Sequence, residues 1–253
     1  MRHALARLVG ELTWQPFWTA RRHAYRRQIT RQIFKPQSGN QSDQNNPKEK
    51  KKHFKVISWN LLHRTGGASV HDVTALIRHE CPDILLMQEA KSELDILPDL
   101  IGGFYARAPL PGRVHGIACW SLIPFERPSR TCPIPSGVLV KRHVQIIEFA
   151  SFSLANVHLS HGQVLNRRQL RRIAAILPAP CAILGDFNLV GPTLLPDFAD
   201  VGPQTPTHRM AHVVPIRIDR CLVRGMACFS AETLAASVSD HRPISVTLTP
   251  QEP

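Results

Sequence analysis

The sequence has no long apolar run. No stretch of its 253 residues approaches the roughly 20 consecutive apolar residues that a membrane-spanning helix requires, so we expect no such helix. Hydrophobic residues make up 43% and charged residues 20% of the chain, which is typical of a folded protein. Aromatic residues are only 6%, so few side chains can stack on unpaired bases, and this disfavours a specialist for single-stranded nucleic acid.

The six cysteines form no CxxC pair. Their spacing favours neither a disulfide framework nor a zinc site, and it indicates buried free thiols in a reducing compartment. Arg7 and Glu11 interrupt the apolar beginning of the chain and no small-residue cleavage site follows, so we expect no secretion signal. These features together predict a cytoplasmic protein. The cysteines are Cys81, Cys119, Cys132, Cys181, Cys221 and Cys228.

Negative charge is scarce in the first 53 residues. This part holds 12 Lys and Arg against three Asp and Glu, so it carries most of the net charge of +12. The rest of the chain is only mildly basic. The positive charge therefore belongs to the N-terminal segment rather than to the main folded body.

Residues 1–35 are basic and amphipathic, with Leu5 and Leu8 at helical spacing and Arg on the other faces. Such a segment can dock on its own domain or stay unfolded, lie on an anionic membrane surface, or bind nucleic acid. Residues 36–53 are rich in Gln, Asn, Ser and Lys, and they predict a flexible linker. Residues 54–250 are then expected to form the main domain. Membrane contact through the first segment would make the protein peripheral to the membrane.

From residue 54 onward, short β-rich runs predict nine strands and helical periodicity predicts two helices. Two helices are too few for a doubly wound parallel sheet, so the pattern favours two packed mixed β-sheets flanked by helices. The predicted strands cover Phe54–Trp59, Asp83–Met87, Gly116–Leu122, Gly137–Val140, Val144–Phe149, Leu154–Leu159, Cys181–Leu184, Ile216–Val223 and Ile244–Leu248. The predicted helices cover Val70–Glu80 and Gln163–Leu177.

Polar residues stand at the ends of the predicted strands. Because loops at one edge of packed sheets come together, these groups should gather in one cleft. Carboxylate and amide oxygens in such a cleft are suitable ligands for Mg²⁺, or alternatively Mn²⁺. The imidazoles beside them can serve in general acid–base chemistry. The residues are Asn60, Glu89, His158, Asp186, Asn188, Asp219, Asp240 and His241.

Each of these residues also has a purely structural explanation. Asn60 can cap a turn, and Asp186 with Asn188 can form an Asx-turn after a strand. Asp219 can pair with a neighbouring arginine, and His158 can be a hydrogen-bonded histidine of the core. Their occurrence together in this order favours a functional site.

The order of the motifs is the strongest signal. The segments WNLL, MQEA, NVHLSHG, LGDFNL, IDRCLV and SDHRPI, spread from Asn60 to His241, resemble the endonuclease/exonuclease/phosphatase superfamily, whose members share the deoxyribonuclease I-like fold. The resemblance covers residues 54–250 and makes them the catalytic domain. It implies a four-layer α/β sandwich and hydrolysis of phosphoester bonds.

The resemblance also implies a metal site. Glu89 is the implied main ligand, Asn60 lies beside it, and Asp240 is a second metal-associated carboxylate. The implied ion is Mg²⁺, with Mn²⁺ as the alternative. Asp186 and Asn188 are implied to orient the attacking water and the phosphate.

The implied acid–base groups are histidines and their partners. Asp219 is implied to hydrogen-bond His241, so that the pair can take the proton of the attacking water, with Asp186 as the competing base. His158 can donate to the phosphate oxygens or to the leaving oxygen. His158 stands where DNA-repair members often have Tyr, and Leu62 stands where those members carry an acid. Both differences weaken the interpretation as an abasic-site endonuclease.

Arg167 and Arg168 begin the second predicted helix, where they can steer phosphate toward the site or form a solvated basic face. The chain is thus predicted to be a monomeric phosphodiesterase or nuclease. One alternative is a phosphoesterase that acts on phospholipid or inositol phosphate at a membrane surface, with residues 1–35 touching the anionic lipid. An alternative of another class is a catalytically silent binding protein on the same fold.

Overall fold

The computed structural model describes residues 53–63, 67–138, 140–210 and 213–251. One sheet consists of β13 (Met226–Thr233), β14 (Ile244–Pro250), β1 (Phe54–Asn60), β2 (Ile84–Lys91), β4 (His115–Ser121) and β3 (Phe104–Pro109), in this order. The second consists of β5 (Arg130–Pro133), β6 (His143–Glu148), β7 (Ser153–His158), β8 (Cys181–Asp186), β12 (Asp219–Arg224) and β9 (Ala199–Asp200). A separate ribbon pairs β10 (His208–Met210) with β11 (Val214–Ile216).

Both six-stranded sheets are mixed. Within each, one neighbouring pair is parallel, β1 with β2 and β7 with β8, and the other pairs are antiparallel. A parallel pair needs a long crossover connection, and here the connections contain α2 (Val70–Glu80) and α4 (Gln163–Ile176). The short helices η1 (Ser92–Ile96) and α3 (Leu97–Ile101) follow β2.

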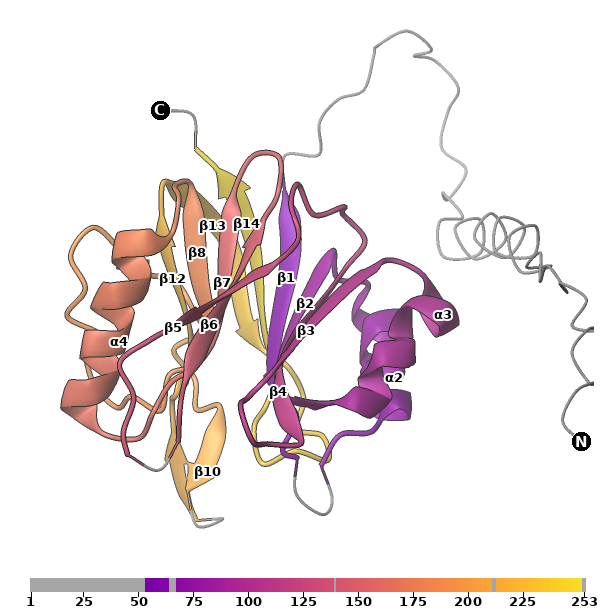
Figure 1. The fold of residues 1–253 in the computed structure, drawn as a ribbon, viewed down its shortest axis with the longest axis horizontal. Helices are drawn as coiled ribbons and strands as arrows, with labels where there is room; N and C mark the ends of the chain where they lie inside the picture. The colour runs from indigo at the N-terminus through magenta and orange to yellow at the C-terminus, as the bar shows by residue number, and fades with distance from the viewer. Residues whose placement is uncertain (1–52, 64–66, 139, 211–212, 252–253) are drawn as a thin grey trace, which may run out of the picture. The chain divides into compact units, whose positions relative to one another are not determined.

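The sheets pack face to face between two helical layers (Figure 1). Helices α2 and α3 cover the outer face of the first sheet, and α4 covers the outer face of the second. This arrangement confirms the predicted four-layer α/β sandwich. None of the described helices is long and apolar enough to cross a membrane.

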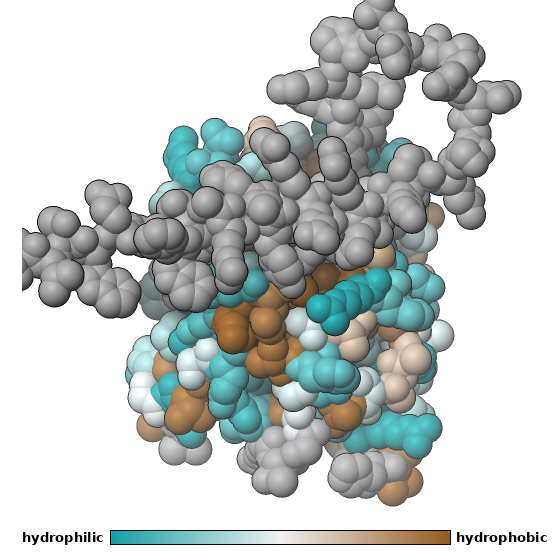
Figure 2. Space-filling view, turned by 90° about the vertical axis from the view of Figure 1, so that its right-hand side faces the viewer, coloured by the Kyte–Doolittle hydropathy of each residue, from teal (hydrophilic) through white to brown (hydrophobic). Residues whose placement is uncertain are grey.

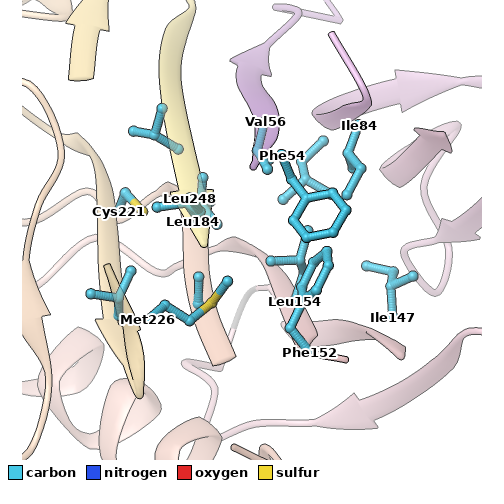
Figure 3. Close-up of a cluster of buried hydrophobic side chains, with 14 of the residues drawn as sticks. Phe54, Val56, Ile84, Ile147, Phe152, Leu154, Leu184, Cys221, Met226 and Leu248 are labelled. Carbon is cyan, nitrogen blue, oxygen red and sulfur yellow. The ribbon is translucent and has the colours of Figure 1, made fainter. Parts of the chain in front are cut away.

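Strand β2 is apolar at consecutive positions because both of its faces are buried. Ile84 and Leu86 point into the core between the sheets, whereas Leu85 and Met87 pack toward α2 and α3. Strands buried on both faces need apolar residues at every position. Figure 3 shows the core between the sheets, where side chains of both sheets meet.

The outer helical layer is amphipathic. Figure 2 shows the side of the domain that carries α2 and α3, where brown apolar patches lie among teal polar ones. The exposed large apolar side chains of η1, α3 and β3 are those of Ile96, Leu100 and Phe104. The opposite faces of these elements supply Leu94, Leu97 and other residues to the core.

The predicted strand at Gly137–Val140 is wrong. Gly137, Val138 and Val140 belong to no strand, and Val138 is 96% exposed. Ser136 closes a loop here, because its hydroxyl donates to Ile134 O and accepts from the Arg142 amide. The local β propensity therefore finds no neighbouring strand and no core to pack against.

The predicted strand at Ile216–Val223 is divided into two. Strand β11 ends at Ile216, and β12 begins at Asp219. The hydroxyl of Thr207 accepts hydrogen bonds from the amides of Ile218 and Asp219, at 3.2 and 3.1 Å, in place of a strand ladder.

The cysteines, all within the described residues, are free thiols. Cys119, Cys181 and Cys221 are buried as expected, but Cys81 is exposed because it ends α2 in a left-handed conformation. The expectations for residues 1–35 and for the linker up to residue 52 lie outside the described residues.

Candidate active site

The second sheet aligns three predicted site residues. His158 ends β7 opposite Asp186 at the end of β8, and Asp186 in turn lies opposite Asp219 at the start of β12. Residues paired in register share one face of a sheet. The three side chains therefore form a row across neighbouring strands at one sheet edge.

Gly185 permits the close approach of β8 to β7 directly before Asp186. Its φ is 142°, which side chains rarely tolerate, and a Cβ at this position would lie 2.0 Å from the carbonyl oxygen of Val157. The glycine of the LGDFNL motif thus has a steric role in positioning Asp186.

Asp186 accepts hydrogen bonds from both predicted amides. Asn60 Nδ2 donates to Asp186 Oδ2 at 3.0 Å, so the first sheet contacts the second at this point. The amide of Asn188 donates to Asp186 Oδ1 at 2.9 Å, and Asn188 Nδ2 lies 3.3 Å from Oδ2. Asn188 has a φ of 48°, so the expected Asx-turn is present and also brings the Asn188 side chain to the site.

His241 lies between two carboxylates. Its Nδ1 is 2.8 Å from Asp219 Oδ2, and its Nε2 is 3.8 Å from Asp186 Oδ2. His158 approaches the same oxygen of Asp186 through its Nε2, at 3.4 Å. Asp219 is therefore paired with His241 and not with a neighbouring arginine.

The loop before β14 is held against the end of β1. Ser239 Oγ donates to Asn60 O at 2.7 Å and accepts from the His241 amide at 3.1 Å. The indole N–H of Trp59 donates to His241 O at 3.2 Å. These contacts fix the backbone of His241, and they give the Ser of the SDHRPI motif a role that the sequence did not assign.

The charges explain the protonation of the buried groups. Burial disfavours a charged imidazole, but Asp219 and Asp186 outweigh burial and raise the pKa of His241 to about 10. Burial raises the pKa of Asp186 to about 6, against the opposing effect of the His241 charge. Burial holds the pKa of His158 well below 6.5, so its imidazole is neutral at pH 7.

Glu89 occupies a β-bulge. Gln88 and Ala90 pair with consecutive residues of β4, so Glu89 is the extra residue, with a φ of 57°. A bulge redirects a side chain away from the regular alternation. The carboxylate accepts from the His63 amide at 2.9 Å and contacts His63 Nδ1.

A stacked pair of histidines flanks Glu89. The His63 and His115 rings lie 3.8 Å apart with an interplanar angle of 18°. Burial acts to raise the pKa of Glu89, but the hydrogen bonds from His63 outweigh burial and lower it. Nothing in the local sequence distinguished these two histidines, because they become neighbours only when the loop after β1 meets β4.

Six of the eight predicted residues are thus joined by contacts of 3.8 Å or less. They are Asn60, His158, Asp186, Asn188, Asp219 and His241. Asp240 adjoins this group through its neighbour His241. Glu89 contacts His63 instead, and none of these contacts joins it to the six.

Two groups of described side chains have the spacing to hold a metal ion. One is Asp186, Asp219 and His241, and the other is His208, Asp240 and His241, with ligand atoms within 4.8 Å of one another in each group. Asp240 Oδ1 is buried and has no hydrogen-bond partner. An unsatisfied buried carboxylate oxygen is consistent with a cation site.

Arg167 and Arg168 do not contact the six joined residues. Arg167 donates to Pro192 O at 2.8 Å and to Gln163 O at 2.7 Å, so its guanidinium is used within its own surroundings. Arg168 is exposed.

Solved structures with the same fold come from animals and bacteria. Humanized D. rerio TDP2 with 14 mutations gives a TM-score of 0.65 at 16% identity, over 78% of this chain and 99% of that one. An endonuclease/exonuclease/phosphatase from Bacteroides vulgatus gives 0.65 at 17% identity, over 79% and 100%. D. rerio TDP2 complexed with a single-strand DNA product gives 0.61 at 14% identity, over 78% and 99%. At these identities the similarity shows the fold alone.

Sequence comparison identifies the family. No curated protein matches the chain, but the profile of the Endonuclease/Exonuclease/phosphatase family matches residues 57–241, from β1 to the site histidine. This match includes every predicted site residue and supports phosphoester hydrolysis as the general reaction. The chain belongs to the endonuclease/exonuclease/phosphatase family.

Proposed function

We propose that this chain is a divalent-metal-dependent phosphodiesterase that cleaves nucleic acid strands. The observation that carries the proposal is the position of His241, whose two ring nitrogens face the carboxylates of Asp219 and Asp186. A purely structural histidine needs no second buried carboxylate at its other nitrogen. Acid–base groups that share one small region are typical of hydrolytic sites.

Asp219 determines which ring nitrogen of His241 can act on the substrate. Asp219 accepts a hydrogen bond from Nδ1–H of His241, and this leaves Nε2 directed toward Asp186. In the proposed reaction Asp186 accepts a proton from the attacking water as the water oxygen bonds to phosphorus. The bond between phosphorus and the leaving ester oxygen breaks, and that oxygen takes up a proton from solvent water. His241, kept cationic by its two carboxylates, donates from Nε2 to a phosphate oxygen as negative charge builds up.

His158 and the two amides complete the proposed phosphate site. Neutral His158 can donate one hydrogen bond to a phosphate oxygen, and Asn188 can donate another. Asn60 holds Asp186 in place from the opposite sheet. These groups are neutral, so they add donors without adding charge to be neutralised.

The metal ion proposed for this site is Mg²⁺, with Mn²⁺ as the alternative. Glu89 and Asp240 would supply carboxylate oxygens, and Asn60 would supply an amide oxygen, which are ligands suited to these ions. The unpartnered Oδ1 of Asp240 fits this assignment. A bound divalent ion would neutralise charge on the phosphate, which the surrounding carboxylates otherwise repel.

A nucleic acid strand is the proposed substrate because of charge and similarity. Phosphate contacts dominate the binding of nucleic acids, and both the domain and its N-terminal segment are basic. One structure with the same fold, D. rerio TDP2, holds a single-strand DNA product. The low aromatic content argues that binding depends on phosphate contacts more than on base stacking.

A substrate panel tests the proposal. The full-length protein would be assayed on single-stranded DNA, plasmid DNA, RNA, sphingomyelin, inositol phosphates and bis-p-nitrophenyl phosphate, with Mg²⁺, Mn²⁺ or EDTA. We expect metal-dependent cleavage of DNA or RNA that His241→Ala abolishes. Turnover of only sphingomyelin or an inositol phosphate would show that the substrate is not a nucleic acid. No turnover of any diester would contradict the proposed phosphodiesterase activity.

A further inference from the structure

Arg142 lies in the loop directly before β6, which begins at His143. Its amide donates to Ser136 Oγ at 2.8 Å, and its carbonyl accepts from the Ile134 amide at 3.2 Å. Strands β6 and β7 pair antiparallel with Val144 opposite Val157. The start of β6 therefore lies next to the end of β7, which is where His158 stands.

The guanidinium of Arg142 has no hydrogen-bond or ion-pair partner among the described residues. Its Nε is buried without a hydrogen bond, and no described carboxylate forms an ion pair with it. Every other described arginine that is not exposed has an acceptor. These arginines are Arg107, Arg167, Arg217, Arg220, Arg224 and Arg242.

A partly buried cation without a counter-ion is costly. Arg142 is only partly exposed, and its buried Nε has neither a carboxylate nor a hydrogen-bond acceptor among the described residues. The chain nevertheless fixes the backbone of this residue with hydrogen bonds to Ser136 and Ile134. Such an arrangement suits a group whose partner is an anion that arrives from solution.

The charge of Arg142 affects the pKa values of site residues, and the site acids affect its own pKa. Burial lowers the pKa of Arg142, and the opposing effect comes from Asp186 and then Glu89. After burial, the charge of Arg142 is the largest influence that lowers the pKa of His158 and of His161. The charge of Arg142 therefore interacts with one acid of each sheet and with two histidines.

We propose that Arg142 binds the phosphate group of the substrate. A guanidinium presents a planar fork of N–H donors that matches two oxygens of one phosphate, and the charge strengthens both hydrogen bonds. This assignment rests on the proposed function for the identity of the substrate. It differs from the expectation for Arg167 and Arg168, of which Arg167 already donates to backbone carbonyls.

Inorganic phosphate tests the proposal without requiring catalysis. Thermal unfolding of the full-length protein would be measured in a Mg²⁺ buffer with increasing phosphate, for wild type, Arg142→Met and Arg142→Lys. The control is Arg130→Met, because Arg130 lies on β5 of the same hairpin, is exposed and pairs with Glu148. Phosphate should raise the Tm of wild type and of the control.

Arg142→Met should lose most of this phosphate-dependent rise. In phosphate-free buffer its Tm should equal or exceed that of wild type, because the unpaired buried Nε and the uncompensated charge are gone. If Arg142→Met does not fold, Arg142→Lys decides, since Lys keeps the charge but loses the fork. Its apparent affinity for phosphate should fall about tenfold or more.

The proposal would be overturned if phosphate raised the Tm of the folded Arg142 variant as much as that of wild type. It would also be overturned if phosphate did not raise the Tm of wild type. Kinetics on bis-p-nitrophenyl phosphate separate this proposal from the proposed function. Arg142→Lys should raise KM about tenfold there. If wild type hydrolyses no diester, the proposed function fails, and the phosphate titration still decides the role of Arg142.

Discussion

His158 and Asp186 face each other across the parallel strands β7 and β8, with His158 Nε2 3.4 Å from Asp186 Oδ2. Both side chains are buried. Burial disfavours the charged form of each group, and the cations Arg142 and His241 further disfavour a charge on His158. The site therefore holds a neutral imidazole next to a cationic one, that of His241.

This relationship predicts acid sensitivity. The pKa of folded His158 lies well below 6.5, so below pH 6.5 the unfolded chain binds a proton that the folded chain resists. Stability should thus decrease as the pH falls below this value. His158→Gln removes the group, so the Tm of this variant should fall less than that of wild type between about pH 7.5 and 5.5. Equal losses in both proteins would show that His158 does not resist protonation.

Gly185 should be intolerant of any side chain. Gly185→Ala would place a Cβ 2.0 Å from Val157 O at a φ of 142°, so we expect a loss of about 3 kcal/mol or more in the free energy of unfolding. Gly191→Ala is the matched control, because its φ is 85° but no atom lies within 4 Å of the added Cβ. Its cost should be about 1 kcal/mol. Denaturant unfolding with equal losses for the two variants would contradict the steric explanation.

Much of the fold could be predicted because strands buried on both faces have continuous apolar runs. β2 is recognisable for this reason, and α2 is recognisable by its helical period. Gly137–Val140 misled the same reasoning, since an apolar run also occurs in a loop that no strand accompanies. The short strands β9 and β10 carry too few residues for any period to be detected.

The site could be predicted where its residues end apolar strands. Asp186 and His158 follow buried runs, so their polarity is conspicuous in the sequence. Arg142 and His63 lie in or beside loops and have no such context. Their neighbours are set by how the two sheets meet, which depends on contacts between distant segments. The roles given to all these residues stay predictions, as does the division into segments 1–35, 36–53 and 54–250.

Loss of the Glu89 carboxylate should reduce metal-dependent turnover. Glu89→Gln keeps the shape of the side chain but removes its charge, so we expect kcat to fall about a hundredfold and the Mg²⁺ concentration for half-maximal activity to rise. Glu93→Gln, at an exposed position in η1, is the control and should match wild type. Undiminished turnover of a diester in excess EDTA would refute the metal dependence.

The central claim is that Asp219 and His241 act as one unit in phosphodiester hydrolysis. Its most direct test is a double-mutant cycle with Asp219→Asn, His241→Ala and the double variant, assayed on bis-p-nitrophenyl phosphate with Mg²⁺. Each single variant should lose about a hundredfold or more in kcat/KM, and the double variant should be little worse than the worse single one. Losses that add fully on a logarithmic scale, or a His241→Ala protein with wild-type turnover, would contradict the account.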